Sequence, residues 1–135
     1  MKITDVHKWE KAVSLILQID GWDLECVGDK NLPYDAIGTT PKGYDCVMEM
    51  KFRDKYYEEK LLEKQKYDEL MKLNVVALYF VNDPKGNYLY WLNKLDLPEP
   101  TELYCPSTTL WNSKKIKKPV YLLQENQASI INLNK

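Results

Sequence analysis

The sequence predicts an α/β domain built around a mixed β-sheet. Apolar residues near the start recur at three- and four-residue steps, the pattern of a helix packed on one face. Three short apolar segments separated by turn residues follow, and then a Leu-, Glu- and Lys-rich stretch without glycine or proline precedes two further apolar segments. The order is helix, three strands, helix, strand, strand, which is typical of an α/β layout. The chain has 135 residues, enough for a single domain over 1–135 with one core.

The first helix has a capping residue, an apolar stripe and a stop signal. Thr4 or Asp5 is suited to cap its start, and Gly21 ends it. The stripe consists of Val6, Trp9, Val13, Ile16 and Leu17. We expect this stripe to pack on the sheet.

The three strands that follow are expected over residues 22–27, 33–39 and 44–52. Proline and glycine in the connection 40–43 fix a tight turn, so the second and third strands should form a hairpin. Residues 56–73 should form the second long helix, and residues 75–81 and 88–92 two more strands.

The chain divides at about residue 92. Residues 4–92 contain the regular succession of elements, and residues 93–135 form a C-terminal extension with an irregular segment. In that extension, residues 114–118 form a basic run, residues 120–123 favour a strand, and residues 125–133 favour a final helix.

Composition excludes several classes of protein. No signal-peptide core and no apolar segment of membrane-spanning length is present, so we expect a cytoplasmic protein with no membrane partner. Cys26, Cys46 and Cys105 lack the spacing of a disulfide framework or a zinc site. His7 is the only histidine, which argues against a histidine-based site. The chain has 19 basic and 20 acidic residues, so bulk electrostatic attraction to nucleic acid is not indicated.

Glu49 and Lys51 are the first candidates for chemistry. They lie two residues apart on an expected strand, so their side chains leave the same face, while Met48, Met50 and Phe52 point to the other face and should form the core. A carboxylate that holds a divalent cation and an ammonium group that reaches the phosphate are what phosphodiester hydrolysis requires.

A second acidic ligand should come from the partner strand of the hairpin. Asp45 shares the face of Glu49 but lies about 13 Å away along the strand, too far to share one ion. Asp35 lies opposite Glu49 if paired residue numbers in the hairpin sum to 84, and a slip of one residue would turn it to the other face. We therefore expect Asp35 and Glu49 to be close together.

Glu10 is a further candidate. On the first helix it lies beside the apolar stripe and not on the solvated side, where a lone carboxylate is costly to bury. Two interpretations remain open for this residue, namely a member of the site and a glutamate that curls out to water.

These residues resemble the PD-(D/E)XK nuclease superfamily over 4–92. Residues 34–38, Tyr-Asp-Ala-Ile-Gly, are similar to its first acidic segment, with tyrosine in place of proline before Asp35, and residues 48–52 to its E-x-K strand. The resemblance implies a restriction-endonuclease-like core in which Asp35, Glu49 and Glu10 bind Mg²⁺ or Mn²⁺ and Lys51 positions or activates the nucleophile. Residues implied to contact nucleic acid are Lys51, Arg53, Gln65 and Lys66. The resemblance also implies that the protein acts in a bacterial or phage-infected cell.

Two functional hypotheses follow. The first is a metal-dependent endonuclease that cuts DNA in a structure-directed or weakly sequence-specific manner, as junction resolvases do, and that acts as a homodimer; RNA is not excluded as its substrate. The second is a non-catalytic module on the same fold that binds nucleic acid or a protein through aromatic side chains and lysines, among them the basic run at 114–118.

Overall fold

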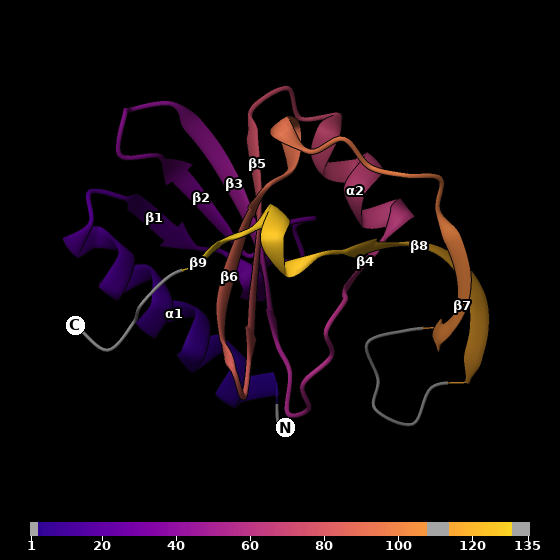
Figure 1. Cartoon of the computed structure of the whole chain (residues 1–135). Helices are drawn as coiled ribbons and strands as arrows, with labels where there is room; N and C mark the ends of the chain where they lie inside the picture. Colours follow the sequence, from indigo (N-terminus) through magenta and orange to yellow (C-terminus); the bar gives the residue numbers. More distant parts are fainter. Residues whose placement is uncertain (1–2, 108–113, 131–135) are drawn as a thin grey trace.

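The computed structural model describes residues 3–107 and 114–130 (Figure 1). A six-stranded sheet has the strand order β1-β2-β3-β5-β6-β9, and a three-stranded sheet has the order β4-β8-β7. In these ranges no helix is long and apolar enough to cross a membrane. The elements in chain order are α1 (Ile3–Ile19), β1 (Asp23–Cys26), η1 (Gly28–Lys30), β2 (Ala36–Thr39), β3 (Asp45–Phe52), β4 (Lys60–Glu63), α2 (Lys64–Met71), β5 (Val76–Asp83), β6 (Gly86–Trp91), η2 (Leu92–Lys94), β7 (Thr101–Pro106), β8 (Lys115–Leu123), η3 (Glu125–Gln127) and β9 (Ser129–Ile130).

Helix α1 forms where the apolar stripe predicts it. Val13 and Leu17 are buried against the six-stranded sheet. The helix ends as expected at Gly21, whose φ of 94° lies in the left-handed region and whose amide bonds to the Gln18 carbonyl at 3.1 Å. The helix begins at Ile3, so Asp5 lies within the first turn instead of capping it.

The hairpin has the register that the sequence predicts. Ala36 pairs with Met48 and Thr39 with Asp45, so paired numbers sum to 84. The turn closes as the Gly43 amide bonds to the Thr40 carbonyl at 2.8 Å, with a φ of 85° at Gly43. The first strand of the hairpin is shorter than predicted, because regular pairing begins at Ala36 and not at residue 33.

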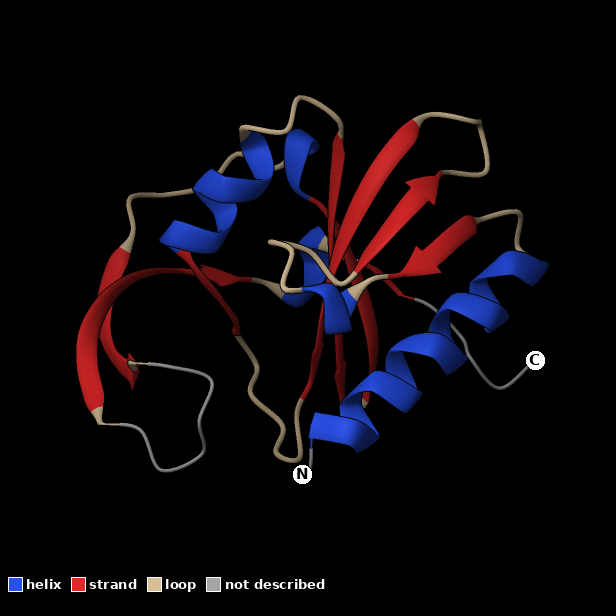
Figure 2. Cartoon of the chain, turned by 180° about the vertical axis from the view of Figure 1, so that it is seen from behind, coloured by secondary structure: helices blue, strands red, loops and turns tan. Residues whose placement is uncertain are grey.

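Strand β3 lies inside the large sheet, antiparallel to β2 and parallel to β5, which confirms a mixed sheet. Met48 and Met50 face α1 in the first core cluster, as predicted. The other face is covered as well. There α2, β4 and β8 form a second cluster with Val47 and Tyr79 of the sheet (Figure 2). Glu49 therefore leaves a covered face of the sheet.

The prediction of one helix over 56–73 is wrong in its first part. Residues 60–63 form strand β4, which pairs with β8 so that Leu62 lies opposite Tyr121, and the helix begins at Lys64. Burial of Leu62 and its pairing with a strand almost sixty residues later outweigh the helix propensity of the segment, which is worth only tenths of a kcal/mol per residue.

The C-terminal extension also differs from expectation. The strand at 120–123 is confirmed and is longer than predicted, because β8 begins at Lys115 within the basic run. The predicted helix at 125–133 is wrong: η3 is a single turn, and β9 then pairs with β6 through Ser129 and Leu89. Residues 131–133 lie outside the described part of the chain. The edge of the six-stranded sheet is thus completed by the C-terminal segment.

Lys60 at the start of β4 connects three segments. Its ammonium group bonds to Asp83 at 2.7 Å and to Glu125 at 3.2 Å, and it donates to the Tyr57 carbonyl at 2.6 Å. The side chains of Lys60 and Asp83 are only 2% and 1% exposed. Removing one partner would leave a buried charge without compensation.

We predict that Lys60→Met lowers the free energy of unfolding by about 3–5 kcal/mol, since the buried Asp83 carboxylate loses its counter-ion. Urea unfolding measures this change. Lys64→Met is the matched control, because it breaks the half-exposed pair of Lys64 with Asp68 and should cost less than about 1 kcal/mol. Equal losses for the two variants would contradict the prediction.

Candidate functional site

Three carboxylates come together from three different elements. Glu10 lies on the inward side of α1, Asp35 directly precedes β2, and Glu49 lies in the middle of β3. Glu10 is 4% exposed and Glu49 is 7% exposed. Figure 2 shows the segment between β1 and β2, which carries Asp35, between α1 and α2. The interpretation of Glu10 as a side chain that curls out to water is therefore wrong.

Asp35 is held by hydrogen bonds to Met48 and Met50, the residues before and after Glu49 in the chain. Its amide donates to the Met48 carbonyl at 2.9 Å, and its Oδ2 accepts from the Met50 amide at 2.8 Å. Its carbonyl accepts from the Val27 amide at 2.8 Å, which ties it to β1 as well. The carboxylate of Asp35 is consequently fixed beside the β3 backbone at Glu49.

Gly28, in η1, allows Glu10 and Asp35 to approach each other. A Cβ added at this glycine would lie 2.5 Å from Oε1 of Glu10 and 3.3 Å from Oδ1 of Asp35. Both carboxyl groups thus lie against the same backbone position, and they share a side-chain hydrogen bond. Nothing in the local sequence of Gly28 distinguishes it from other turn glycines, so only the structure identifies its contact with the two carboxyl groups.

Two lysines lie near the carboxylates. Nζ of Lys66, on α2, is 3.7 Å from Oε2 of Glu49 and donates to the Pro33 carbonyl at 2.9 Å. Lys51 follows Glu49 by two residues on β3, and the positive charges of Lys66 and Lys51 both act on the Glu49 carboxylate. Lys66 thereby joins the loop before Asp35 to the strand that carries Glu49.

The other two residues proposed to contact nucleic acid lie farther out. Gln65 is exposed, its amide is 3.5 Å from Oε1 of Glu69, and it lines a shallow surface hollow on α2 instead of approaching the carboxylates. Arg53 is exposed just after β3, where its amide bonds to the Asn82 carbonyl at 2.8 Å. The structure thus brings Glu10, Asp35, Glu49, Lys51 and Lys66 together and leaves Gln65 outside.

Mutual repulsion changes the protonation of the site. Burial, and then the negative charges of Asp35 and Glu49, raise the pKa of Glu10 to about 7. Burial and the charge of Asp35 also raise the pKa of Glu49 to about 7, although Lys66 and Lys51 oppose this shift. Simultaneous ionisation of Glu10 and Glu49 is therefore disfavoured near neutral pH, and a bound cation would relieve their repulsion.

The donor set fits a hard divalent cation. Carboxylate oxygens are the ligands that Mg²⁺ and Mn²⁺ prefer, and Mg²⁺ commonly takes one or two carboxylates and keeps several waters. Within residues 3–107 and 114–130, no three acidic, cysteine or histidine side chains are arranged as a ready metal site. The site therefore suits a cation that is bound by two carboxylates and by water. Glu10 lies at hydrogen-bonding distance from Asp35.

Comparison with known proteins shows the fold. No family model matches the sequence, and no curated protein matches it. Among solved structures, the chain is similar to Hjc, a Holliday junction resolvase from Archaeoglobus fulgidus, with a TM-score of 0.60 and 13% sequence identity over 92% of this chain and 89% of the resolvase. Hjc is a member of the PD-(D/E)XK family. This likeness confirms the restriction-endonuclease-like α/β fold that the sequence predicts.

The raised pKa values predict how stability depends on pH. Because the folded state favours protonated Glu10 and Glu49, their stabilising contribution is complete below about pH 4.5 and is lost as the pH rises through about 7. In metal-free buffer at about pH 8, Glu10→Gln should raise the free energy of unfolding by about 1–3 kcal/mol relative to the wild type. Urea unfolding as a function of pH measures this difference.

The exposed Glu25 provides the control for that experiment, since Glu25→Gln should leave the pH profile of the wild type unchanged. Added Mg²⁺ or Mn²⁺ should stabilise the wild type more at about pH 8 than at about pH 5, because deprotonated carboxylates bind the ion. Parallel pH profiles for the wild type and Glu10→Gln would contradict the coupling of the carboxylates.

Gly28→Ala tests the close packing around the two carboxyl groups. The new methyl group must displace the Glu10 carboxylate, whose end is flexible, so the main effect should fall on the site and not on the fold. We expect divalent-metal affinity, measured by calorimetry, to fall about tenfold or more, as it does when groups that orient metal ligands are altered. Gly86→Ala, where an added Cβ makes only ordinary contacts, should leave metal affinity unchanged.

Proposed function

We propose that the chain is a divalent-metal-dependent endonuclease that hydrolyses DNA phosphodiester bonds. The observation that carries this proposal is the convergence of Glu10, Asp35 and Glu49 with Lys51 and Lys66 at one buried place. The fold supports it, since a structure of the same fold is that of a Holliday junction resolvase.

The residues of the chain have distinct roles in this proposal. Asp35 and Glu49 hold the cation, and Glu10, bonded to Asp35, completes or orients the set. The cation, when bound, polarises the phosphate and lowers the pKa of the attacking water. The Asp35 carboxylate is already oriented for this role, because hydrogen bonds to the Met50 amide and the β3 backbone hold it in place.

The lysines supply positive charge. Lys51, on the same face of β3 as Glu49, is placed to stabilise the charge that develops on the phosphate. Lys66 lies 3.7 Å from Glu49 and balances its carboxylate, and Arg53 extends the positive side chains along the path of β3. Acidic and basic side chains, both of which a hydrolytic site requires, thus lie together on and beside β3.

The substrate that we propose is DNA with a branched or otherwise distorted structure. The solved structure that shares its fold is that of a Holliday junction resolvase, which favours recognition of DNA shape over sequence. Paired cuts at a branch require two sites, so we propose that the protein works as a homodimer.

Cleavage assays with four-way junction, single-stranded and duplex DNA test the proposal. In Mn²⁺ the wild type should cut the junction, and Glu49→Gln and Lys51→Ala should each lower the rate by at least about 100-fold, the scale of losing a transition-state contact. Asp45→Asn is the matched control, since Asp45 lies on the same strand but is exposed, and this variant should keep full activity.

Activity that survives Glu49→Gln or Lys51→Ala would refute the assignment of the site. A non-catalytic binding module would instead bind nucleic acid without metal and show no Mn²⁺ binding by calorimetry. For the proposed nuclease, the calorimetric Mn²⁺ signal should be present in the wild type and lost in Asp35→Asn.

A further inference from the structure

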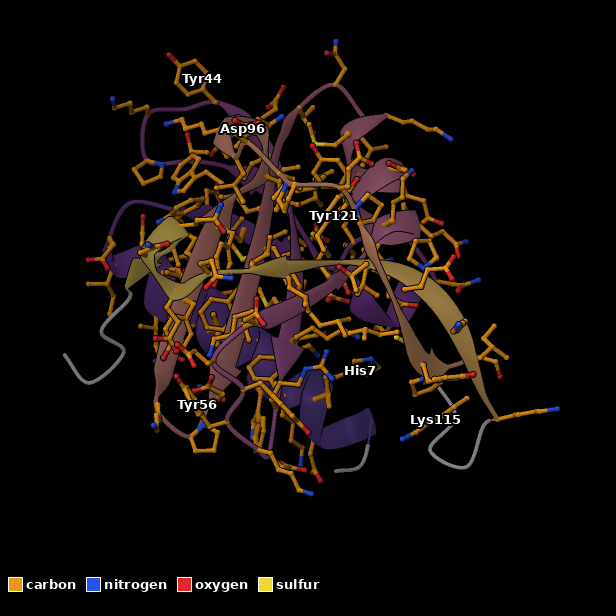
Figure 3. All side chains as sticks on the ribbon, turned by 45° about the vertical axis from the view of Figure 1, so that its right-hand side comes forward. His7, Tyr44, Tyr56, Asp96, Lys115 and Tyr121 are labelled. Atoms are coloured by element: carbon orange, nitrogen blue, oxygen red, sulfur yellow. The ribbon has the colours of Figure 1, made fainter. Side chains whose placement is uncertain are left out.

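A curved two-stranded ribbon extends from the body of the molecule (Figure 1). It consists of β7 and the first part of β8, paired from Thr101 opposite Val120 to Pro106 opposite Lys115. Figure 3 shows Lys115 out on this ribbon, whereas Tyr121, farther along the same strand, lies within the body. The first part of β8 thus lies outside the core, and its last part lies within it.

The base of the ribbon is fixed to the site-bearing body. Lys118 forms an ion pair with Glu63, the residue before α2, at 2.8 Å. Cys105 is buried on the same face of the ribbon as Lys118, and Val120 begins the pairing of β8 with β4. These contacts hold the ribbon in a defined direction relative to α2, which also carries Lys66.

The outer face of the ribbon is basic and open. Tyr104 is 68% exposed and lies opposite Lys117, while Lys115 lies two residues away on that face. Nζ of Lys117 is 5.9 Å from the centre of the Tyr104 ring. Lys114, which is also exposed, extends the pairing by one residue, since its carbonyl accepts the Ser107 amide at 2.9 Å.

Unlike Lys118, the other lysines of the ribbon and its end lack an acidic partner among the described residues. Lys114, Lys115 and Lys117 are exposed, and in the described part of the chain none of them takes part in an ion pair. Glu102 is the one acidic residue in 101–107 and 114–119. In a chain with 19 basic and 20 acidic residues, this local excess of positive charge is a distinct feature of the surface.

We propose that this ribbon binds the phosphate backbone of duplex DNA through Lys114, Lys115 and Lys117. The part of the substrate that it binds is distant from the carboxylates. The inference rests on the proposed function. A two-stranded β-ribbon is narrow enough to enter the major groove, and lysines about 6.7 Å apart along one strand face present successive charges to the backbone. Lysine contacts to phosphates give affinity without reading sequence, which agrees with recognition of DNA shape.

The test compares two double variants of equal charge. Lys115→Ala/Lys117→Ala removes the ribbon charges, and Lys42→Ala/Lys72→Ala removes two exposed lysines from the β2–β3 turn and the end of α2. Binding of a labelled duplex is measured by fluorescence anisotropy over a series of salt concentrations, in a chelating buffer that prevents cleavage. Thermal unfolding of each variant verifies that it is folded.

The ribbon variant should bind more weakly than the wild type, and its salt slope, log Kd against log salt, should fall by about 1.8, the value for two lost phosphate contacts. Between about 0.05 and 0.2 M salt, the wild type should then lose about 12-fold more affinity than the ribbon variant. The control variant should keep the slope of the wild type.

Equal slopes for the two double variants, or no binding of duplex DNA by the wild type, would overturn the role of the ribbon. Binding that depends on the ribbon in a protein without nuclease activity would overturn the proposed function and leave the ribbon site standing. If the partner of this face were an acidic protein instead, the ribbon variant would bind DNA as tightly as the wild type does, and the proposal would be wrong.

Discussion

The parallel pairing of β3 with β5 is the constraint on which the rest of the structure depends. Parallel strands cannot be joined by a tight turn, so the chain must leave β3 and cross one face of the sheet before it returns as β5. Strand β4 and α2 make this crossing, and the return of β8 beside β4 covers that face further. The crossing places Lys66 over the strand that carries Glu49.

The same crossing explains the electrostatics of the site. A strand that is paired on both edges and covered on both faces buries any side chain at its middle, and Glu49 occupies that position. Glu10 on α1 and Asp35 beside β2 add two more carboxylates, and the negative charge of Asp35 helps to raise the pKa of both Glu10 and Glu49. Such an arrangement is costly to stability without a cation and typical of a site whose function requires one.

Polar groups in the interior serve two different purposes in this chain. Lys60 and Asp83 satisfy each other within hydrogen-bond distance and stabilise the contact of β4 with the C-terminal segment. The three carboxylates carry the same charge when ionised and repel one another, and the hydrogen bond between Glu10 and Asp35 requires a proton on that pair. The contrast separates a structural ion pair from the site that we propose to bind a cation.

The sequence by itself determined α1, the β2–β3 hairpin and its register, because turn chemistry and period-two alternation are local properties. That register was also sufficient to select Asp35 over Asp45 as the neighbour of Glu49. Only the tertiary structure decided that residues 60–63 form a strand and that the segment after residue 124 joins the sheet, because the pairing partners are distant in sequence. It also decided that Gly28 lies against Glu10 and Asp35 and that Gln65 lies outside the site. The basic run likewise belongs to a projecting ribbon. No local sequence pattern determines which segments meet across the fold.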